Sequence, residues 1–201
     1  MSAPNLRSCV MASPVLCVFC GTNSGSSPAF LQAATDLGTA MAVRGIGLVY
    51  GGGKLGLMGA VADAVLEAGG QVTGVIPQGL VEAEVAHRGL SALEVTDTMH
   101  TRKARMAEIA TGFIALPGGF GTYEEVLEVL TWNQLGFIAK PVVLVDIDDF
   151  YAPLFELFAK AAEAGFVRPA HVALAQRART VADAVERAIA PAPLTETKWN
   201  R

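Results

Sequence analysis

Short runs of apolar residues alternate along the chain with longer stretches in which apolar positions recur at helical spacing. Short continuous apolar runs are typical of strands buried on both faces of a parallel sheet. Because helical stretches separate these runs, the pattern predicts an α/β fold with a doubly wound parallel sheet and helices on both faces. We expect strands at residues 15–20, 46–50, 71–76, 112–116 and 141–145, and a further short strand at 93–96.

The first helix has sequence signals at both ends. Ser27 and Pro28 supply an N-cap and a first-turn proline, and Gly45 ends the helix after Arg44. The pattern predicts a single domain over residues 14–190, a disordered lead at 1–13 and a flexible tail at 191–201, where prolines stand among polar residues. Further helices are expected at residues 56–68, 101–110, 123–135, 151–164 and 181–190.

Composition and charge exclude several classes of function. Hydrophobic residues make up 52% of the 201 residues and charged residues only 17%, so we expect some apolar surface to be buried between subunits. Gly, Pro or charge interrupts every long apolar run, which predicts no membrane span. A net charge of −4 disfavours a nucleic-acid surface. The basic cluster of Arg102, Lys103 and Arg105 is too small for a duplex and suits one phosphorylated small molecule.

The cysteines and histidines indicate neither a disulfide framework nor a metal site. Cys9, Cys17 and Cys20 are three in number, and the odd spacing of the last two places them on opposite faces of the predicted first strand. We expect buried, reduced thiols in a cytoplasmic protein. His87, His100 and His171 lie far apart in the sequence and form no zinc-type spacing, so no metal is expected.

Glycine-rich loops follow three of the predicted strands, at residues 20–25, 50–56 and 116–122. In open parallel sheets, ligands bind beside the carboxyl ends of the strands, so chemistry is expected in these loops. The spacing of Gly51, Gly53 and Gly56 fits a phosphate loop or merely tight packing. NAD is disfavoured because no acidic residue ends the next strand. The candidates for phosphate contacts in the first two loops are Gly21, Thr22, Gly51, Gly52 and Gly53.

The segment Pro-Gly-Gly-Phe-Gly-Thr-Tyr-Glu-Glu at 117–125, which begins in the third loop, is more specific. Its glycines expose backbone N–H groups at the start of a helix, which favours binding of an anion. A structural alternative is a capping box in which Thr122 is the N-cap and Glu125 lies three residues later.

The basic run that opens the helix before this strand also allows two interpretations. Arg102 and Lys103 are adjacent on a predicted helix and point to different sides, so one could face a ligand. A solvated basic face is the ordinary alternative. We expect Met99 and Met106 to pack in the core rather than form a ligand site.

These motifs together resemble the LONELY GUY family, the cytokinin riboside 5′-monophosphate phosphoribohydrolases, which are often mislabelled as lysine decarboxylases. The resemblance covers about residues 15–167. It is supported by Thr-Trp-x-Gln-Leu-Gly at 131–136 and Lys-Pro-Val at 140–142. It rests on Pro-Gly-Gly-x-Gly-Thr-x-x-Glu at 117–125, Met-His-x-Arg-Lys at 99–103 and Gly-Gly-Gly-x-x-Gly-Leu-Met-Gly at 51–59.

The resemblance implies a Rossmann-like fold, a homodimer with active sites near the subunit interface, and no cofactor. It implies hydrolysis of N6-substituted adenosine 5′-monophosphates to free base and ribose 5-phosphate, with catalysis by Arg102 and Glu125. Two departures, Thr22-Asn23 in the first loop and Ile138 before Lys140, affect base preference and phosphate contacts. The implied substrate-binding residues are Glu84, Arg102, Lys103, Gly118, Gly119, Phe120, Gly121, Thr122, Tyr123, Glu124 and Thr131.

The chemistry of the bond explains why a carboxylate and a cation are needed. Cleavage of an N-glycosidic bond develops oxocarbenium character on the ribose, which Glu125 can stabilise while it activates water. Arg102 can hold the phosphate or ribose and orient Glu125. Two alternatives stay open at this point: a general purine monophosphate nucleosidase that uses the same residues, and a non-catalytic nucleotide carrier or sensor.

Overall fold

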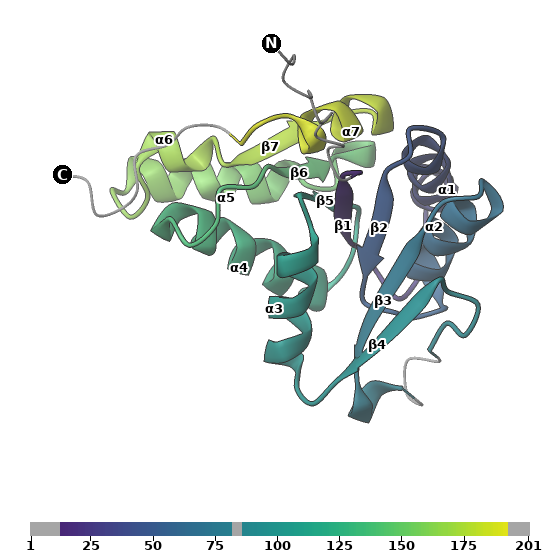
Figure 1. The fold of residues 1–201 in the computed structure, drawn as a ribbon. Coiled ribbons are helices and arrows are strands. Elements are labelled where there is room, and N and C mark those ends of the chain that lie inside the picture. The colour runs from purple at the N-terminus through teal and green to yellow at the C-terminus, as the bar shows by residue number, and fades with distance from the viewer. Residues whose placement is uncertain (1–12, 82–85, 193–201) are drawn as a thin grey trace, which may run out of the picture.

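The computed structural model describes residues 13–81 and 86–192, in which strands and helices alternate (Figure 1). All six predicted strands are present, with ends that differ by at most one residue. The seventh, β7, was not predicted because Gln176 and Arg177 interrupt its apolar pattern. The strands are β1 (Val15–Phe19), β2 (Gly47–Tyr50), β3 (Val72–Pro77), β4 (Ala92–Thr96), β5 (Gly112–Ala115), β6 (Val142–Val145) and β7 (Ala175–Ala178).

The strands form one sheet in the order β4-β3-β2-β1-β5-β6-β7, and every neighbouring pair is parallel. The chain first winds outward from β1 to β4 and then returns to the other side of β1 to continue from β5 to β7. The predicted doubly wound α/β fold is therefore confirmed. Because the winding direction changes between β1 and β5, the loops that leave these two strands diverge and make room for a ligand.

All six predicted helices are present and differ from the prediction mainly at some N-termini, whereas the short helix at Pro169–Val172 was not predicted. Ser27 is the N-cap of the first helix, and its hydroxyl accepts a hydrogen bond from the Ala29 N–H, as predicted. Two helices begin earlier than predicted, α3 after the N-cap Thr98 and α4 after the N-cap Gly119. The helices are α1 (Pro28–Val43), α2 (Gly56–Glu67), α3 (Met99–Ile109), α4 (Phe120–Leu135), α5 (Ala152–Glu163), α6 (Pro169–Val172) and α7 (Val181–Ile189), and the short 3-10 turns are η1 (Gln78–Leu80) and η2 (Ile147–Asp149).

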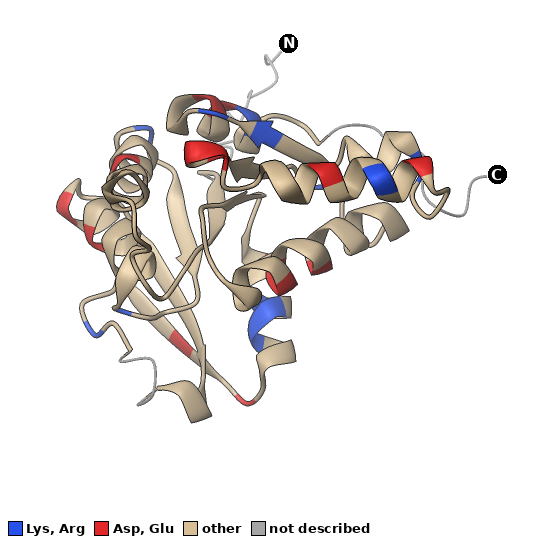
Figure 2. Ribbon diagram, turned by 180° about the vertical axis from the view of Figure 1, so that it is seen from behind, with Lys and Arg blue, Asp and Glu red and all other residues tan. Residues whose placement is uncertain are grey.

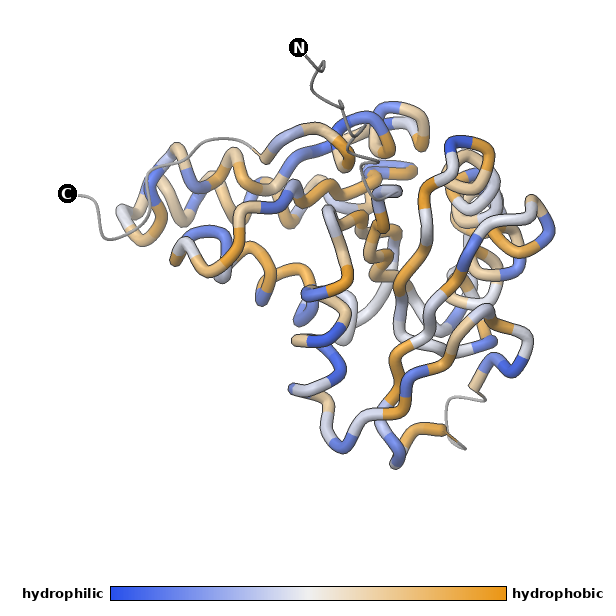
Figure 3. The backbone as a smooth tube through the Cα atoms, viewed as in Figure 1, coloured by the Kyte–Doolittle hydropathy of each residue, from blue (hydrophilic) through white to orange (hydrophobic). Residues whose placement is uncertain are grey.

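Two apolar cores lie on opposite faces of the sheet. Helices α1, α2 and α7 pack on one face, and α3, α4 and α5 contribute to the core on the other. Cys20 belongs to the first core and Cys17 to the second, which confirms the prediction of opposite faces and burial. The central strands are mostly hydrophobic, whereas α3 is largely hydrophilic (Figure 3). A polar helix at the edge of a core is unusual enough to need a reason, which lies in the cavity described below.

The chain is a single domain, as predicted. Apart from Ser13, Pro191 and Ala192, the predicted disordered lead (1–13) and flexible tail (191–201) lie outside the described residues. In the described part of the chain, no helix combines the length and the apolar character needed to cross a membrane.

Candidate active site

A cavity of about 250 Å³ opens at the carboxyl ends of β1, β2 and β5, where the winding direction of the sheet changes. Helices α3 and α4 contribute its remaining walls. It contains both residues to which the family resemblance gives a catalytic role, together with most of the third glycine-rich loop. Its lining consists of Val18, Phe19, Cys20, Gly21, Thr22, Gly51, Met58, Met99, Arg102, Gly119, Phe120, Gly121, Thr122, Glu124 and Glu125.

The N-terminus of α4 forms one end of the cavity. Gly119 is the N-cap and makes no side-chain cap, so the capping box predicted as an alternative for Thr122 and Glu125 is wrong. The helix begins one turn earlier because the glycine-rich segment already has helical geometry from Phe120. Thr122 is buried in the first turn and lines the cavity. The first-turn N–H groups and the positive end of the helix dipole therefore face the cavity, as an anion-binding site requires.

The glycines of this loop have different roles. A Cβ on Gly118 would collide with the Thr122 hydroxyl, so Gly118 lets Thr122 pack inward. An added Cβ on Gly119 or Gly121 would have no atom within 4 Å apart from the neighbouring residues and the backbone of the same helix, and neither glycine has a positive φ. Neither backbone conformation nor packing within the chain requires glycine at these two positions. The space that they leave belongs to the cavity, which supports the prediction that the loop binds a ligand.

Arg102 reaches the cavity from α3 and is held there by backbone carbonyls. Its Nε donates to the Val75 carbonyl at 3.0 Å and its Nη2 donates to the Gly51 carbonyl at 2.9 Å. The side chain is only 4% exposed, so the alternative of a solvated basic face is wrong for this residue. The guanidinium also contacts the sulfur of Met99. These contacts fix the plane of a buried cation at the cavity wall, which accounts for one of the two buried charged residues of α3.

Only Gly51 of the second glycine-rich loop lines the cavity. A Cβ at this position would collide with the Arg102 guanidinium, so this glycine makes room for the arginine. The carbonyl of Gly52 accepts from the His87 N–H, and that of Gly53 accepts from the Tyr50 hydroxyl. Packing within the chain thus accounts for this loop, and no phosphate contact is required to explain it.

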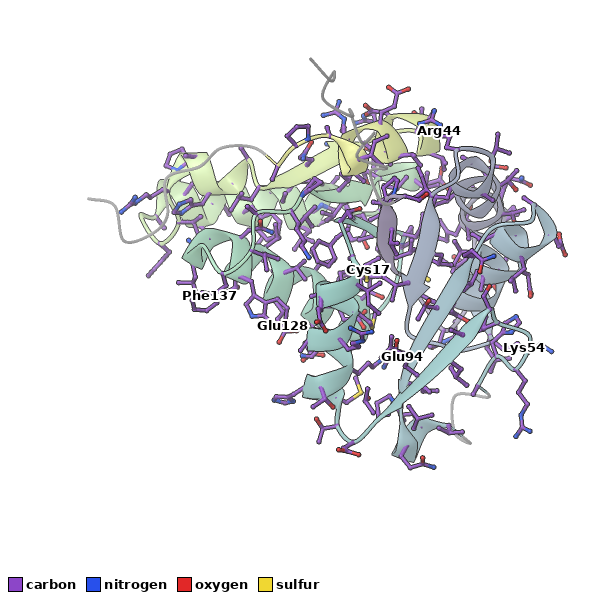
Figure 4. The ribbon with its side chains drawn as sticks, viewed as in Figure 1. Cys17, Arg44, Lys54, Glu94, Glu128 and Phe137 are labelled. Carbon is purple, nitrogen blue, oxygen red and sulfur yellow. The ribbon has the colours of Figure 1, made fainter. Side chains whose placement is uncertain are left out.

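Lys54, which follows these glycines, points away from the body of the molecule (Figure 4). In the first loop, by contrast, the candidates Gly21 and Thr22 both line the cavity.

Glu125 lies in the second turn of α4, one turn beyond Gly121 and Thr122 and on the same face of the helix. It lines the cavity beside the end of β1. Burial raises the pKa of the Cys17 and Cys20 thiols, and the negative charge of Glu125 raises both further. Cys20, which also lines the cavity, is therefore a neutral thiol near a carboxylate, and both cysteines stay protonated at neutral pH.

Lys103 and Glu124 connect α3 to α4. The ammonium of Lys103 lies 2.6 Å from a carboxylate oxygen of Glu124 and 3.2 Å from one of Glu128. The basic segment of α3 lies beside acidic positions of α4 (Figure 2). Glu124 lines the cavity, whereas Lys103 is buried between the helices and does not. Lys103 thus holds α3 against α4 and fixes the position of Glu124, which forms part of the cavity wall.

Replacing Lys103 with methionine is expected to lower the free energy of unfolding by about 2 kcal/mol, because charge-assisted hydrogen bonds are lost. Burial lowers the pKa of Lys103, but the hydrogen bonds and charges of Glu124 and Glu128 outweigh it, so the pKa lies above its ordinary 10.5. The contribution to stability is therefore complete below pH 10.5 and is lost as the pH rises through the folded-state pKa. Urea unfolding of the native protein and of Lys103→Met at pH 7, 9 and 11 measures the difference between their free energies of unfolding, which should be smaller at pH 11. An equal difference at all three pH values would contradict the prediction.

Other predicted site residues do not line this cavity in the single chain. Thr131 lines a second, more apolar cavity along α4, and its hydroxyl donates to the Leu127 carbonyl. Tyr123 packs its ring against Phe150. Glu84 lies outside the described residues.

The structure also corrects and extends the expected lining. Met106 is buried as predicted, but Met99 is 38% exposed and lines the cavity, so its expected place in the core was wrong. Cys20 and Met58 were not predicted as lining residues. The position of Cys20 at the end of a strand before a glycine loop was an available signal. Within residues 13–81 and 86–192, no group of three or more His, Cys, Asp or Glu side chains could hold a metal.

The chain matches one protein-family model and is similar to several curated proteins over most of its length. Residues 58–188 match a protein family described as "Possible lysine decarboxylase". The chain is 49% identical over 153 residues to a probable cytokinin riboside 5′-monophosphate phosphoribohydrolase of Oryza sativa subsp. japonica, covering 76% of this chain and 69% of that protein. It is 48% identical over 154 residues to a cytokinin riboside 5′-monophosphate phosphoribohydrolase of Arabidopsis thaliana, covering 77% of this chain and 71% of that protein.

Among solved structures, a Moco carrier protein from Chlamydomonas reinhardtii has a TM-score of 0.65 at 27% identity and covers 87% of this chain and 94% of that chain. A molybdenum cofactor binding protein from Rippkaea orientalis has a TM-score of 0.66 at 22% identity, and the match covers 88% of this chain and 95% of that chain. The latter likeness shows the fold alone.

Proposed function

The chain belongs to the LONELY GUY family of cytokinin riboside 5′-monophosphate phosphoribohydrolases, and from this premise we propose that it hydrolyses the N-glycosidic bond of N6-substituted adenosine 5′-monophosphates. The products are the free adenine-type base and ribose 5-phosphate. One observation carries the proposal: the uncapped N-terminus of α4, the buried Arg102 and the carboxylate of Glu125 all face one cavity. An anion site beside a carboxylate is what hydrolysis of a nucleoside monophosphate needs.

The phosphate binds at the first turn of α4 in this proposal. Backbone N–H groups of Gly121 and Thr122 point along the helix axis toward the cavity, and the helix dipole favours negative charge there. Arg102 adds a positive charge on the facing wall. Because the phosphate anchors the substrate, a riboside that lacks it loses binding energy and rate together.

A side chain at Gly121 is expected to hinder this phosphate without disturbing the fold. A Cβ there meets no atom within 4 Å apart from the neighbouring residues and the backbone of α4, so Gly121→Ala should keep the native melting temperature within a few degrees. The methyl group enters the space of the ligand, and we expect KM for the monophosphate to rise by roughly tenfold or more. Steady-state kinetics with thermal melting measure both. A variant with unchanged KM would mean that the phosphate lies elsewhere.

Glu125 and Arg102 act at the ribose. As the base leaves, positive charge develops on the ribose ring, and a carboxylate at the cavity wall stabilises it and deprotonates the attacking water. Arg102 cannot lose its charge in a protein, and its backbone contacts fix its orientation. It therefore supplies a preorganised positive charge that orients the substrate beside the carboxylate.

We also propose a cytoplasmic homodimer. Large apolar side chains are exposed on α4, on α5 and just after each of them, at Leu127, Phe137, Leu157 and Phe166. Leu127 also lines the second cavity, which contains Thr131. Phe137 lies at the outer end of α4 (Figure 4). Burial of this surface against a second copy would bring Thr131 close to an active site at the interface, in keeping with the role that the family resemblance gives it. Reduced, buried Cys17 and Cys20 fit the cytoplasm.

Decarboxylation of lysine, which the description of the matched family suggests, is not supported by the cavity. That reaction would require pyridoxal phosphate and a lysine to form its Schiff base. In the described part of the chain, no lysine lines the cavity. Lys103 is engaged by two glutamates, and Lys140 donates to the Ala107 carbonyl at 2.7 Å.

The test is to incubate the purified protein with isopentenyladenosine 5′-monophosphate, AMP and the two corresponding ribosides, and to follow free base by chromatography. Release of base from the monophosphates and not from the ribosides is expected. The ratio of the two monophosphate rates distinguishes a cytokinin-activating enzyme from a general purine monophosphate nucleosidase. If no substrate yields free base, the hydrolase proposal fails, and a nucleotide carrier or sensor becomes the better description.

A further inference from the structure

Tyr151 lies behind the loop that leads into α4. Its side chain is buried, and its hydroxyl donates to the Leu116 carbonyl at 2.7 Å. Leu116 directly follows β5 and precedes Pro117, Gly118 and Gly119. Burial raises the pKa of the Tyr151 hydroxyl, so it stays protonated and able to donate at any physiological pH. Tyr151 does not line the cavity, so its hydrogen bond acts on the loop from the rear.

A charge-assisted network fixes Tyr151 in turn. Its backbone N–H donates to one oxygen of Asp146 at 2.6 Å, and Arg177 on β7 binds the other oxygen. The Asp146 side chain is fully buried, so it needs both partners to compensate for lost solvation. The strand that the sequence pattern did not predict thus supplies the cation that orients the segment after β6.

The turn between Asp146 and Tyr151 has strained backbone geometry. Asp148 and Asp149 both have left-handed conformations, with φ of 52° and 55°. Non-glycine residues keep such conformations only where the surroundings fix them. The Ser27 hydroxyl donates to Asp148, and Arg177 and Arg179 pair with Asp149. Several contacts hold this strained turn in place, and it leads directly into Tyr151. The turn therefore fixes the position from which Tyr151 reaches the glycine loop.

Hydrogen bonds at Leu116 and Pro117 hold the chain where it enters the glycine loop, and one of them joins the Leu116 N–H to the Phe19 carbonyl at 2.9 Å. The Pro117 carbonyl accepts from the Gly21 N–H at 3.1 Å, and the Leu116 carbonyl accepts from Tyr151. Because peptide bonds are planar, these two held carbonyls fix the 116–117 and 117–118 peptide planes, through which the chain enters Gly118. Those planes set the direction of the first-turn N–H groups of α4. Without side chains of their own, the glycines depend on these outer contacts.

We propose that Tyr151 is a positioning residue for the phosphate site: its hydroxyl, fixed by Asp146 and Arg177, holds the loop so that the first turn of α4 meets the phosphate of the substrate. The inference rests on the proposed function for the identity of the ligand. It extends the site to the β6–α5 turn and to β7, to which neither the sequence motifs nor the cavity lining assigns a role.

Tyr151→Phe tests this, because it removes one oxygen atom and keeps the ring that packs edge-on against Phe150. We expect the Kd for AMP, measured by calorimetry, to rise about tenfold, which is the effect of one lost hydrogen bond. The Kd for adenosine, which has no phosphate, should stay unchanged. Tyr50→Phe is the matched control, since Tyr50 is also fully buried and donates to a backbone carbonyl, that of Gly53, outside the cavity.

The outcomes separate the two proposals. If Tyr151→Phe and Tyr50→Phe lose similar thermal stability but only Tyr151→Phe loses AMP affinity, the positioning role is supported. Unchanged AMP affinity, or an equal loss for AMP and adenosine, overturns it. Absence of AMP binding by the unmodified protein also overturns it. Tight AMP binding without release of base from any monophosphate would instead refute the hydrolase proposal and leave the positioning role standing.

Discussion

Replacing Glu125 with glutamine is expected to lower kcat for the monophosphate substrate by about 10²–10⁴-fold, with a much smaller change in KM. Glutamine has the same shape, but it carries no charge to stabilise the oxocarbenium ion and cannot accept a proton from water. The fold should be kept, because Glu125 lies at a cavity wall rather than in the packed core. Chromatographic measurement of free base at several substrate concentrations gives both parameters.

Glu128→Gln is the matched control for this prediction. Glu128 lies on the same helix, three residues further along, and pairs with Lys103 rather than lining the cavity. If reduced negative charge on α4 were the cause of the effect, kcat would fall equally in Glu125→Gln and Glu128→Gln. If Glu125→Gln kept more than a tenth of the native kcat, the catalytic assignment would be wrong, and Glu124 would be the carboxylate to examine next.

Replacing Arg102 with lysine is expected to reduce kcat/KM by about 10²–10³-fold, although the charge is preserved. The planar guanidinium donates in two directions at once, to Val75 and to Gly51, and an ammonium cannot reproduce that geometry. The two carbonyls would lose their partner in a buried place, so we also expect a loss of about 1–3 kcal/mol in the free energy of unfolding. Kinetics and urea unfolding on the same sample measure both effects.

Gly51→Ala displaces Arg102 without changing it, since the new methyl group would occupy the place of the guanidinium. If the orientation of Arg102 matters, this variant should lose activity in the same direction as Arg102→Lys. Full activity of both variants would show that neither the exact position nor the hydrogen bonding of Arg102 contributes to the reaction.

Sequence and tertiary structure define different properties of the two catalytic candidates, Arg102 and Glu125. Spacing alone left two interpretations open for each residue, a ligand contact or a solvated face for Arg102 and a functional carboxylate or a capping box for Glu125, because helix positions alone do not say which face meets a neighbour. The family resemblance assigned both residues roles. The structure brings both to one cavity, buries Arg102, and places the start of α4 where Thr122 and Glu125 are not used for capping.

The sequence by itself determined the doubly wound parallel sheet, the strand–helix alternation, the glycine loops at the carboxyl ends and the opposite faces of Cys17 and Cys20. These features depend on local periodicity and turn chemistry, which each short segment carries within itself. Only the tertiary structure decided that Gly51 makes room for an arginine, that Lys103 joins two helices, and that the Tyr151 hydroxyl contacts the start of the glycine loop. Such contacts join residues distant in the chain, and their energies depend on burial and distance, which exist only once the sheet has brought those segments together.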